Sequence, residues 1–154
     1  MKKIIKVTIK RMTDEGGEAD FLGKYSENPG EPTKTIDRRV LKHYRPGQLP
    51  FFISENTETY TESLVNYNRM EAGMRGDWCL IGIEAEAEVQ FTGDLVQRLT
   101  SGGLWGIESD AGEEYFETIQ QEQLEELEGE LLAVGFTLEE IVAAFENVET
   151  KTSY

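Results

Sequence analysis

The sequence predicts an α+β fold, with a small antiparallel sheet, one helix in the middle of the chain and a C-terminal helical hairpin. Two patterns carry this prediction. Apolar and polar residues alternate with a period of two near residues 3–12 and 78–91, which is typical of strands with one buried face. Apolar residues recur every three or four positions near residues 58–74 and within residues 111–147, which is typical of amphipathic helices. The 154 residues suit a single domain, and no linker divides them.

The strand near residues 78–91 is the most regular one, because isoleucine, alanine and valine alternate there with three glutamates. A turn at residues 92–94 precedes a returning strand near residues 95–100, which predicts a hairpin. The glycine-rich segment 101–107 is either a tight loop or the end of a bent strand, with glycines that allow close packing around Trp105.

The segment 21–50 holds all four prolines and has little periodicity, so we expect a long ordered loop region. Short strands are expected around residues 35–37 and 51–54. In the helix near residues 58–74, the predicted buried positions are Tyr60, Leu64, Tyr67 and Met70 or Met74. Gly76 is the expected C-terminal cap of this helix.

The C-terminal hairpin begins with a long helix over residues 111–134, for which Asp110 and Glu113 form a capping-box pattern. Its predicted buried stripe is Phe116, Leu124, Leu127, Leu131 and Val134. A second capping box, Thr137 with Glu140, starts a helix over residues 138–147. The inward positions expected for this helix are Leu138, Ile141, Val142 and Phe145. The last residues of the chain are expected to fray.

Acidic residues dominate the chain, which has a formal charge of −15. Residues 108–150 hold 14 acidic side chains and no basic one, whereas residues 1–50 have a net charge of +4. A charge of this size disfavours direct binding to nucleic acid or to an anionic membrane. It favours a basic partner or serves solubility, and the sequence leaves both interpretations open. The basic residues Lys34, Arg38, Arg39, Lys42 and Arg45 either contact phosphates or pair with the acidic helix, and the second interpretation is simpler because the rest of the chain would repel nucleic acid.

The long helix supplies the candidate partner-binding residues. They are Glu114, Glu122, Glu125, Glu126 and Glu128. Like charges three or four positions apart on a helix cost about 0.2–0.5 kcal/mol per pair, and no lysine or arginine is interspersed among them. Stability alone does not account for this pattern. The functional interpretation is an acidic surface that imitates a nucleic-acid backbone and meets a basic partner, and the alternative is a solvated, solubilising face.

No residue pattern predicts a catalytic centre, a cofactor or a metal site. Three glutamates on the strand near residues 78–91 (Glu84, Glu86 and Glu88) are about 7 Å apart, which is too wide for one metal shell, so a solvated sheet face is expected. The loop Asp14–Asp20 lacks the calcium-binding EF-hand pattern. His43, the one histidine, has no obvious catalytic partner, and Cys79, the one cysteine, lies in an apolar run and is expected to be buried and inert.

Two segments resemble a family of small uncharacterised proteins encoded by phages, plasmids and integrative elements of bacteria. They are residues 75–78 (RGDW), followed by the strand over residues 81–89, and residues 101–110 (SGGLWGIESD). Residues 22–26 belong to the same pattern, and the resemblance covers most of the chain. It implies no catalytic residue, but it implies a mobile-element setting, in which small acidic proteins are often inhibitors of host restriction or CRISPR systems.

These observations together predict a non-enzymatic acidic binding protein of phage or mobile-element origin. It would occupy a basic nucleic-acid-binding surface on a host defence protein. The chain has no apolar segment long enough for a membrane helix and no signal-peptide pattern, so a cytoplasmic location in the host cell is expected. Two alternatives remain at this stage. One is a metal-dependent enzyme or accessory protein that uses the 13–50 loop region, and the other is a dimeric assembly protein.

Overall fold

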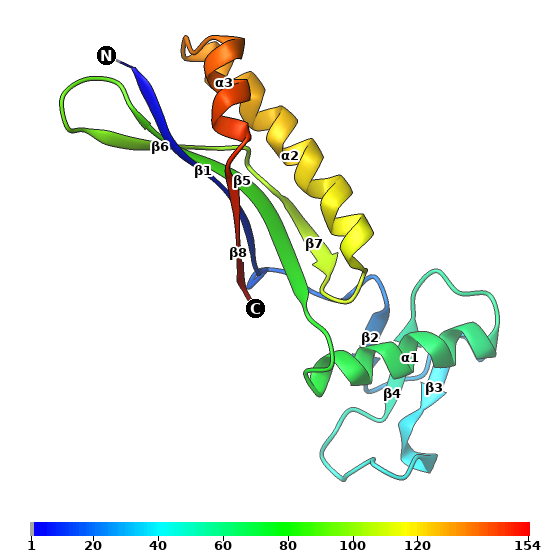
Figure 1. The fold of residues 1–154 in the computed structure, drawn as a ribbon. Coiled ribbons are helices and arrows are strands. Elements are labelled where there is room, and N and C mark those ends of the chain that lie inside the picture. Colours follow the sequence, from blue (N-terminus) through cyan, green and yellow to red (C-terminus); the bar gives the residue numbers. More distant parts are fainter. Residues whose placement is uncertain (1) are drawn as a thin grey trace. The chain divides into compact units, whose positions relative to one another are not determined.

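The computed structural model describes residues 2–154, and the chain divides into two compact units (Figure 1). The first unit combines the residues up to Gly17 with Cys79–Tyr154, and the second unit is Glu18–Trp78. The expectation of one domain over residues 1–154 stays a prediction. Each unit is described below by itself. The α+β class is confirmed, since the described residues form three helices and eight strands.

The first unit contains a mixed five-stranded sheet. Its strands are β1 (Lys3–Thr13), β5 (Leu80–Gln90), β6 (Val96–Thr100), β7 (Leu104–Glu108) and β8 (Val148–Ser153). The order of the strands is β6-β5-β1-β8. The remaining strand, β7, also pairs with β5. The three predicted strands pair antiparallel as expected. The fraying expected at the end of the chain is wrong, because β8 pairs in parallel with β1. Its polar sequence, VETKTS, gives no strand signal, since this edge strand is exposed over nearly its whole length.

Two helices cover one face of this sheet, α2 (Glu113–Ala133) and α3 (Leu138–Phe145) (Figure 1). The odd-numbered residues of β5 from Ile81 to Val89 are fully buried beneath them, together with Val7 and Ile9 of β1. The helices contribute the other half of this core. Their buried residues are Phe116, Ile119, Leu127, Leu131 and Ile141, with Phe136 of the connecting turn. The period-two pattern therefore identified the buried face correctly.

Several predicted details of the helical hairpin need correction. The N-cap of α2 is Gly112, and no side chain caps this end; Glu113 binds Arg11 instead of completing a capping box. Ile119 and Gln123 are buried on α2, whereas Val134 lies beyond its end and is partly exposed. On α3, Leu138 and Val142 are exposed because the short helix presents only one narrow face, around Ile141, to the sheet. The Thr137 cap is confirmed, since its hydroxyl accepts a hydrogen bond from the Glu140 amide at 3.2 Å.

The glycine-rich segment combines both alternatives that the sequence left open, since residues 101–103 form a short loop and residues 104–108 form the strand β7. Ser101 replaces one rung of the ladder: its amide donates to the Ala85 carbonyl at 2.9 Å, and its hydroxyl accepts from the Ala85 amide at 3.0 Å. The same hydroxyl donates to the buried Gln123 side chain of α2 at 2.6 Å. Trp105 packs over Gly82, where a Cβ atom would overlap the indole ring. The expectation of tight packing around Trp105 is confirmed.

The second unit is a three-stranded antiparallel sheet that packs against α1 (Tyr60–Met74). Its strands are β2 (Gly23–Ser26), β3 (Thr35–Asp37) and β4 (Phe51–Ser54), in the order β2-β4-β3, and a single 3-10 turn follows at Arg38–Val40. Phe52 and Ile36 are fully buried at its centre, against Tyr67 of α1. Tyr60 and Met74 are exposed rather than inward-facing, and Ser63 is buried in their place. Gly76 ends α1 with a positive φ of 85°, as predicted.

Candidate partner-binding surface

The outer face of α2 carries the five predicted partner-binding glutamates. Glu114, Glu122, Glu125 and Glu126 are exposed, and Glu128 is half-buried. At about 100° per residue, Glu114, Glu122 and Glu125 lie roughly 140–160° around the helix from the buried Leu127, and Glu126 and Glu128 lie about 100° away on opposite sides. The five side chains therefore form one broad surface that faces away from the sheet, which we call the α2 acidic face.

None of these five carboxylates has an ion-pair partner among residues 2–154. The exception on the helix is Glu113, on the side that faces the sheet. Arg11 of β1 donates to both of its oxygens, at 2.9 and 2.5 Å, and this guanidinium also binds the Gln120 side chain and lies over the ring of Phe116. The pKa of Glu113 is lowered, chiefly by the hydrogen bond from Arg11. One arginine thus ties α2 to the sheet and leaves its outer face unneutralised.

Three other basic residues of the first unit form ion pairs on the sheet. Lys6 pairs with Glu149 at 2.9 Å, Lys10 with Glu86 at 2.7 Å, and Arg98 lies 3.9 Å from both Glu86 and Glu88. Lys2 donates to the carbonyl of Gly135 at 2.7 Å. Between Arg98 and Lys151 the chain has no basic residue, so none is available within the helical hairpin.

The glutamate row on β5 is only in part the solvated face that was expected. The Glu86 side chain is 10% exposed and is held by Lys10, while Glu88 and Glu84 are half-buried. Burial raises the pKa of Glu84. The sequence could not reveal this burial, because the side chains that cover the row come from β1 and β6. No group of three or more metal-binding side chains occurs among residues 2–154.

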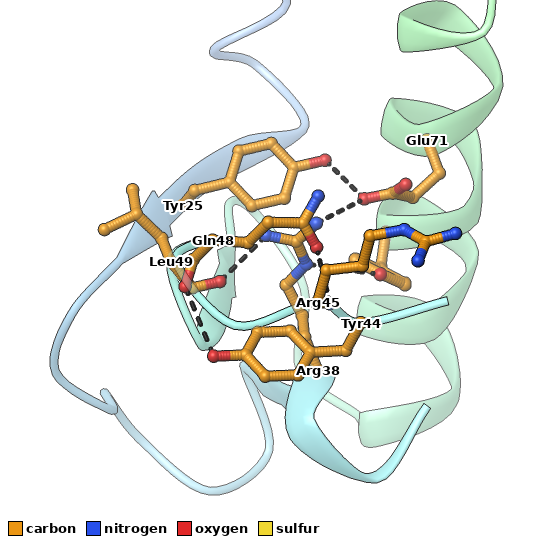
Figure 2. Close-up of polar contacts among 8 residues, drawn as sticks. Tyr25, Arg38, Tyr44, Arg45, Gln48, Leu49 and Glu71 are labelled. Atoms are coloured by element: carbon orange, nitrogen blue, oxygen red, sulfur yellow. Dashed lines mark hydrogen bonds and ion pairs between the residues drawn. The ribbon is translucent and has the colours of Figure 1, made fainter. Parts of the chain in front are cut away.

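The second unit contains a polar network that the sequence did not reveal (Figure 2). The Arg38 side chain is 11% exposed and lies over the ring of Tyr25, 4.5 Å from its centroid. Its guanidinium donates to the Leu49 carbonyl at 2.8 Å and to Glu71 and the Tyr67 hydroxyl at 3.4 Å. The Tyr25 hydroxyl donates to the same Glu71 oxygen at 2.8 Å. This network joins β2, the turn after β3 and α1.

The network is built to hold structure, because each of its polar groups is engaged by another member. Burial, and then the hydrogen bond to Glu71, raise the pKa of Tyr25. Burial also raises the pKa of Tyr67. Arg38 and Arg39 pair with Glu71 and Asp37 of their own unit, so the expected pairing of these arginines with the acidic helix is wrong. The sequence did not reveal that Arg38 and Arg39 pair within their own unit, because five basic residues between positions 34 and 45 suggest one common function.

The remaining candidates do not converge on a reactive site. His43 is exposed in the second unit. Cys79 packs against the core of the first unit but is only partly buried, so the expected burial is confirmed in part, and its inertness stays a prediction. In the loop Asp14–Asp20, the Asp14 carboxylate accepts a hydrogen bond from the Gly106 amide at 2.9 Å. This contact fastens the loop to β7 and gives Asp14 a structural role.

No protein-family model matches the chain, and neither the characterised proteins nor the solved structures that were compared with it gave a match. Among residues 2–154, no helix combines the length and apolar character needed to cross a membrane.

Proposed function

We propose that the chain is a non-enzymatic acidic binding protein of phage or mobile-element origin, whose α2 acidic face occupies a basic nucleic-acid-binding surface on a host defence protein. The observation that carries the proposal is that Glu114, Glu122, Glu125, Glu126 and Glu128 have no ion-pair partner in the described part of the chain, residues 2–154, although seven basic side chains belong to the same unit. The setting rests on the resemblance of the RGDW and SGGLWGIESD segments to proteins of mobile elements.

The charge density of α2 suits imitation of a nucleic-acid strand. The helix has 21 residues and carries seven glutamates besides Glu113. At about 1.5 Å per residue this corresponds to one carboxylate per roughly 4–5 Å of axis. A single DNA strand carries one phosphate per about 3.4 Å. A basic groove that binds a phosphate backbone therefore meets a comparable line of negative charge.

The outer face of α2 also carries residues that lower the stability of the helix. Its glutamates repel one another at i,i+3 and i,i+4 spacing. Gly129 lies in the middle of the helix with no atom within 4 Å of where a Cβ would stand, and glycine at such a position costs about 1 kcal/mol relative to alanine. Packing within the protein explains neither the clustered glutamates nor the glycine. Both features are consistent with a surface that binds a partner.

The first test is capture of partners from a lysate that contains active defence systems, at about 50 mM salt, with elution by increasing salt. The identified partner is then purified, and the protein is titrated against its complex with nucleic acid. We expect competitive displacement, with an affinity that falls steeply with salt because the contacts are ionic. Two results contradict the proposal. One is an affinity that stays constant between about 50 and 500 mM salt, and the other is a complex with the partner that leaves the partner's nucleic-acid binding intact.

Two charge-matched variants locate the interface. In the first, Glu122, Glu125, Glu126 and Glu128 are replaced by lysine, which we expect to abolish binding. In the second, four exposed glutamates away from the helices are replaced by lysine. They are Glu15, Glu18, Glu27 and Glu31. Both variants have the same net charge, so equal loss of binding in the two would show that overall charge, and not the α2 acidic face, determines association.

A further inference from the structure

The second unit has a groove beside the turn that joins β4 to α1, on a surface that the proposed function does not use. Its volume is about 390 Å³, and its lining includes Phe21, Glu55, Asn56, Glu62, Val65 and Asn66. A second hollow of about 330 Å³ shares Phe21, Glu55 and Asn56 with it and continues past Asp20 and Lys24. Two adjoining hollows with common walls make this an elongated site.

The turn that forms one wall is rigidly held. Asn56 has a φ of 52°, the one positive value for a non-glycine residue among residues 2–154, and such a conformation persists where surrounding contacts impose it. The side-chain amide nitrogen of Asn66 lies 3.0–3.1 Å from three acceptors, which share its two N–H groups: the Leu22 carbonyl, the Ser54 hydroxyl and the Glu55 carbonyl next to Asn56. The groove is thus pre-formed, which lowers the entropic cost of binding.

The walls combine exposed apolar surface with negative charge. The Phe21 and Val65 side chains are 45% and 62% exposed. Glu55 and Glu62 line the same groove, no basic residue lines it, and the Glu55 carboxylate has no ion-pair or hydrogen-bond partner among residues 2–154. Glu62 accepts only the weak 3.2 Å hydrogen bond from the Glu58 amide.

We propose that this groove binds an arginine side chain presented by an extended basic peptide. An aromatic ring attracts a guanidinium group placed over its face, the two carboxylates accept its N–H groups, and Val65 packs against the aliphatic part of the side chain. The adjoining hollow, with Asp20 and Lys24 on its wall, takes the neighbouring peptide residue. This site is separate from the α2 acidic face and stands whether or not that face binds a partner.

Two peptides that differ only in the end group of one side chain, a charged guanidinium or a neutral urea, test the proposal on the unmodified protein. Acetyl-Gly-Leu-Arg-Leu-Gly amide is compared with the same peptide that carries citrulline, a neutral isostere, in place of arginine. Binding is followed by calorimetry and by amide chemical shifts. We expect the arginine peptide to bind at least tenfold more tightly, because charge-assisted hydrogen bonds are lost with citrulline. The shifts are expected at Phe21, Glu55 and Asn56. Equal affinities, no binding of either peptide at 10 mM (about the weakest affinity measurable,), or shifts confined to α2 overturn the proposal.

Three substitutions sharpen the test. Glu55→Gln is expected to weaken the arginine peptide about tenfold, and Phe21→Ala about two- to fivefold. Glu58→Gln is the matched control: Glu58 is exposed on the same turn, but it does not line the groove, so its removal is expected to leave the affinity unchanged. A loss with Glu58→Gln as large as that with Glu55→Gln overturns the proposal. The quadruple lysine variant of α2 is expected to bind the peptide normally even if it has lost the partner of the proposed function.

Discussion

The two units of this protein use charge in opposite ways. The second unit, Glu18–Trp78, has 10 acidic and 8 basic residues, and Arg38, Arg39 and Arg75 pair with carboxylates of the same unit. The first unit has 20 acidic and 7 basic residues, a net charge of −13. Lys6 and Lys10 pair with carboxylates of the sheet and Arg11 pairs with Glu113 on the inner side of α2, whereas the outer face of this helix has no ion pair among residues 2–154. The difference teaches that charge maintains the fold in the second unit, whereas on α2 it is directed outward at a cost in stability.

The largest effect is expected where charge maintains the fold. Arg38→Met removes the cation that contacts Glu71, the Leu49 carbonyl and the ring of Tyr25. The Leu49 carbonyl then loses this donor, and the partly buried Glu71 carboxylate loses this ion pair but keeps the hydrogen bond from the Tyr25 hydroxyl. We expect the free energy of unfolding of the second unit to fall by about 2–3 kcal/mol. Urea denaturation followed by Trp78 fluorescence, in a Trp105→Phe background, measures this unit selectively.

The matched control is Arg39→Met. Arg39 also pairs with a carboxylate of the same unit, Asp37 at 2.9 Å, but its side chain is 56% exposed. Exposed ion pairs contribute little, so we expect a change below about 0.5 kcal/mol. Similar losses for the two variants would break the distinction between a buried network and surface charge.

The sequence predicted most of the first unit and less of the second, for a physical reason. The strands β1 and β5 bury every second residue, and this local alternation can be read along the chain. The core of the second unit depends on residues far apart in sequence, such as Tyr25, Arg38 and Glu71. Such a network produces no periodic pattern in the sequence, so Arg38 could not be distinguished from the other basic residues of the segment 34–45.

The α2 acidic face was predicted from the sequence because each of its residues lies on one helix. The groove of the second unit was not, since Phe21, Asn56 and Val65 come from three separate segments. The edge strand β8 was missed because exposed edge strands need few apolar residues. Exposure also explains the errors on α3, where Leu138 and Val142 follow the helical period but the sheet covers only the face of Ile141.

A smaller effect, of opposite sign, is expected where charge is directed outward. Replacing Glu122, Glu125, Glu126 and Glu128 by glutamine removes four like-charge contacts at i,i+3 or i,i+4 spacing. We expect the first unit to become more stable by about 1 kcal/mol at low salt. Added sodium chloride should raise the stability of the unmodified protein and narrow this gap, because it screens exposed charges. Thermal unfolding at several salt concentrations measures both.

The glutamine changes at Glu15, Glu18, Glu27 and Glu31 are the control for this prediction. They reduce the negative charge of the protein by the same amount but remove no repulsion within a helix. We expect a smaller gain in stability from them than from the α2 changes. An equal gain would mean that the total charge, and not its concentration on α2, burdens the fold.

The smallest effect concerns the alkaline range and depends on Tyr25. Burial and Glu71 raise its pKa in the folded protein, so above about pH 10, the usual value, the unfolded chain loses this proton while the folded chain keeps it. The unfolded state then binds fewer protons, and stability must fall as the pH rises. Tyr67, whose pKa is raised by burial, acts in the same direction.

The variant Tyr25→Phe removes one of these two contributions, so we expect the urea midpoint to fall less steeply between about pH 9 and 11. The control is Tyr60→Phe, which replaces an exposed tyrosine and should keep the original slope. An unchanged slope in Tyr25→Phe would mean that the phenol does not share its proton with Glu71 in solution, and the second unit would then owe less to its internal charges than the comparison of the two units implies.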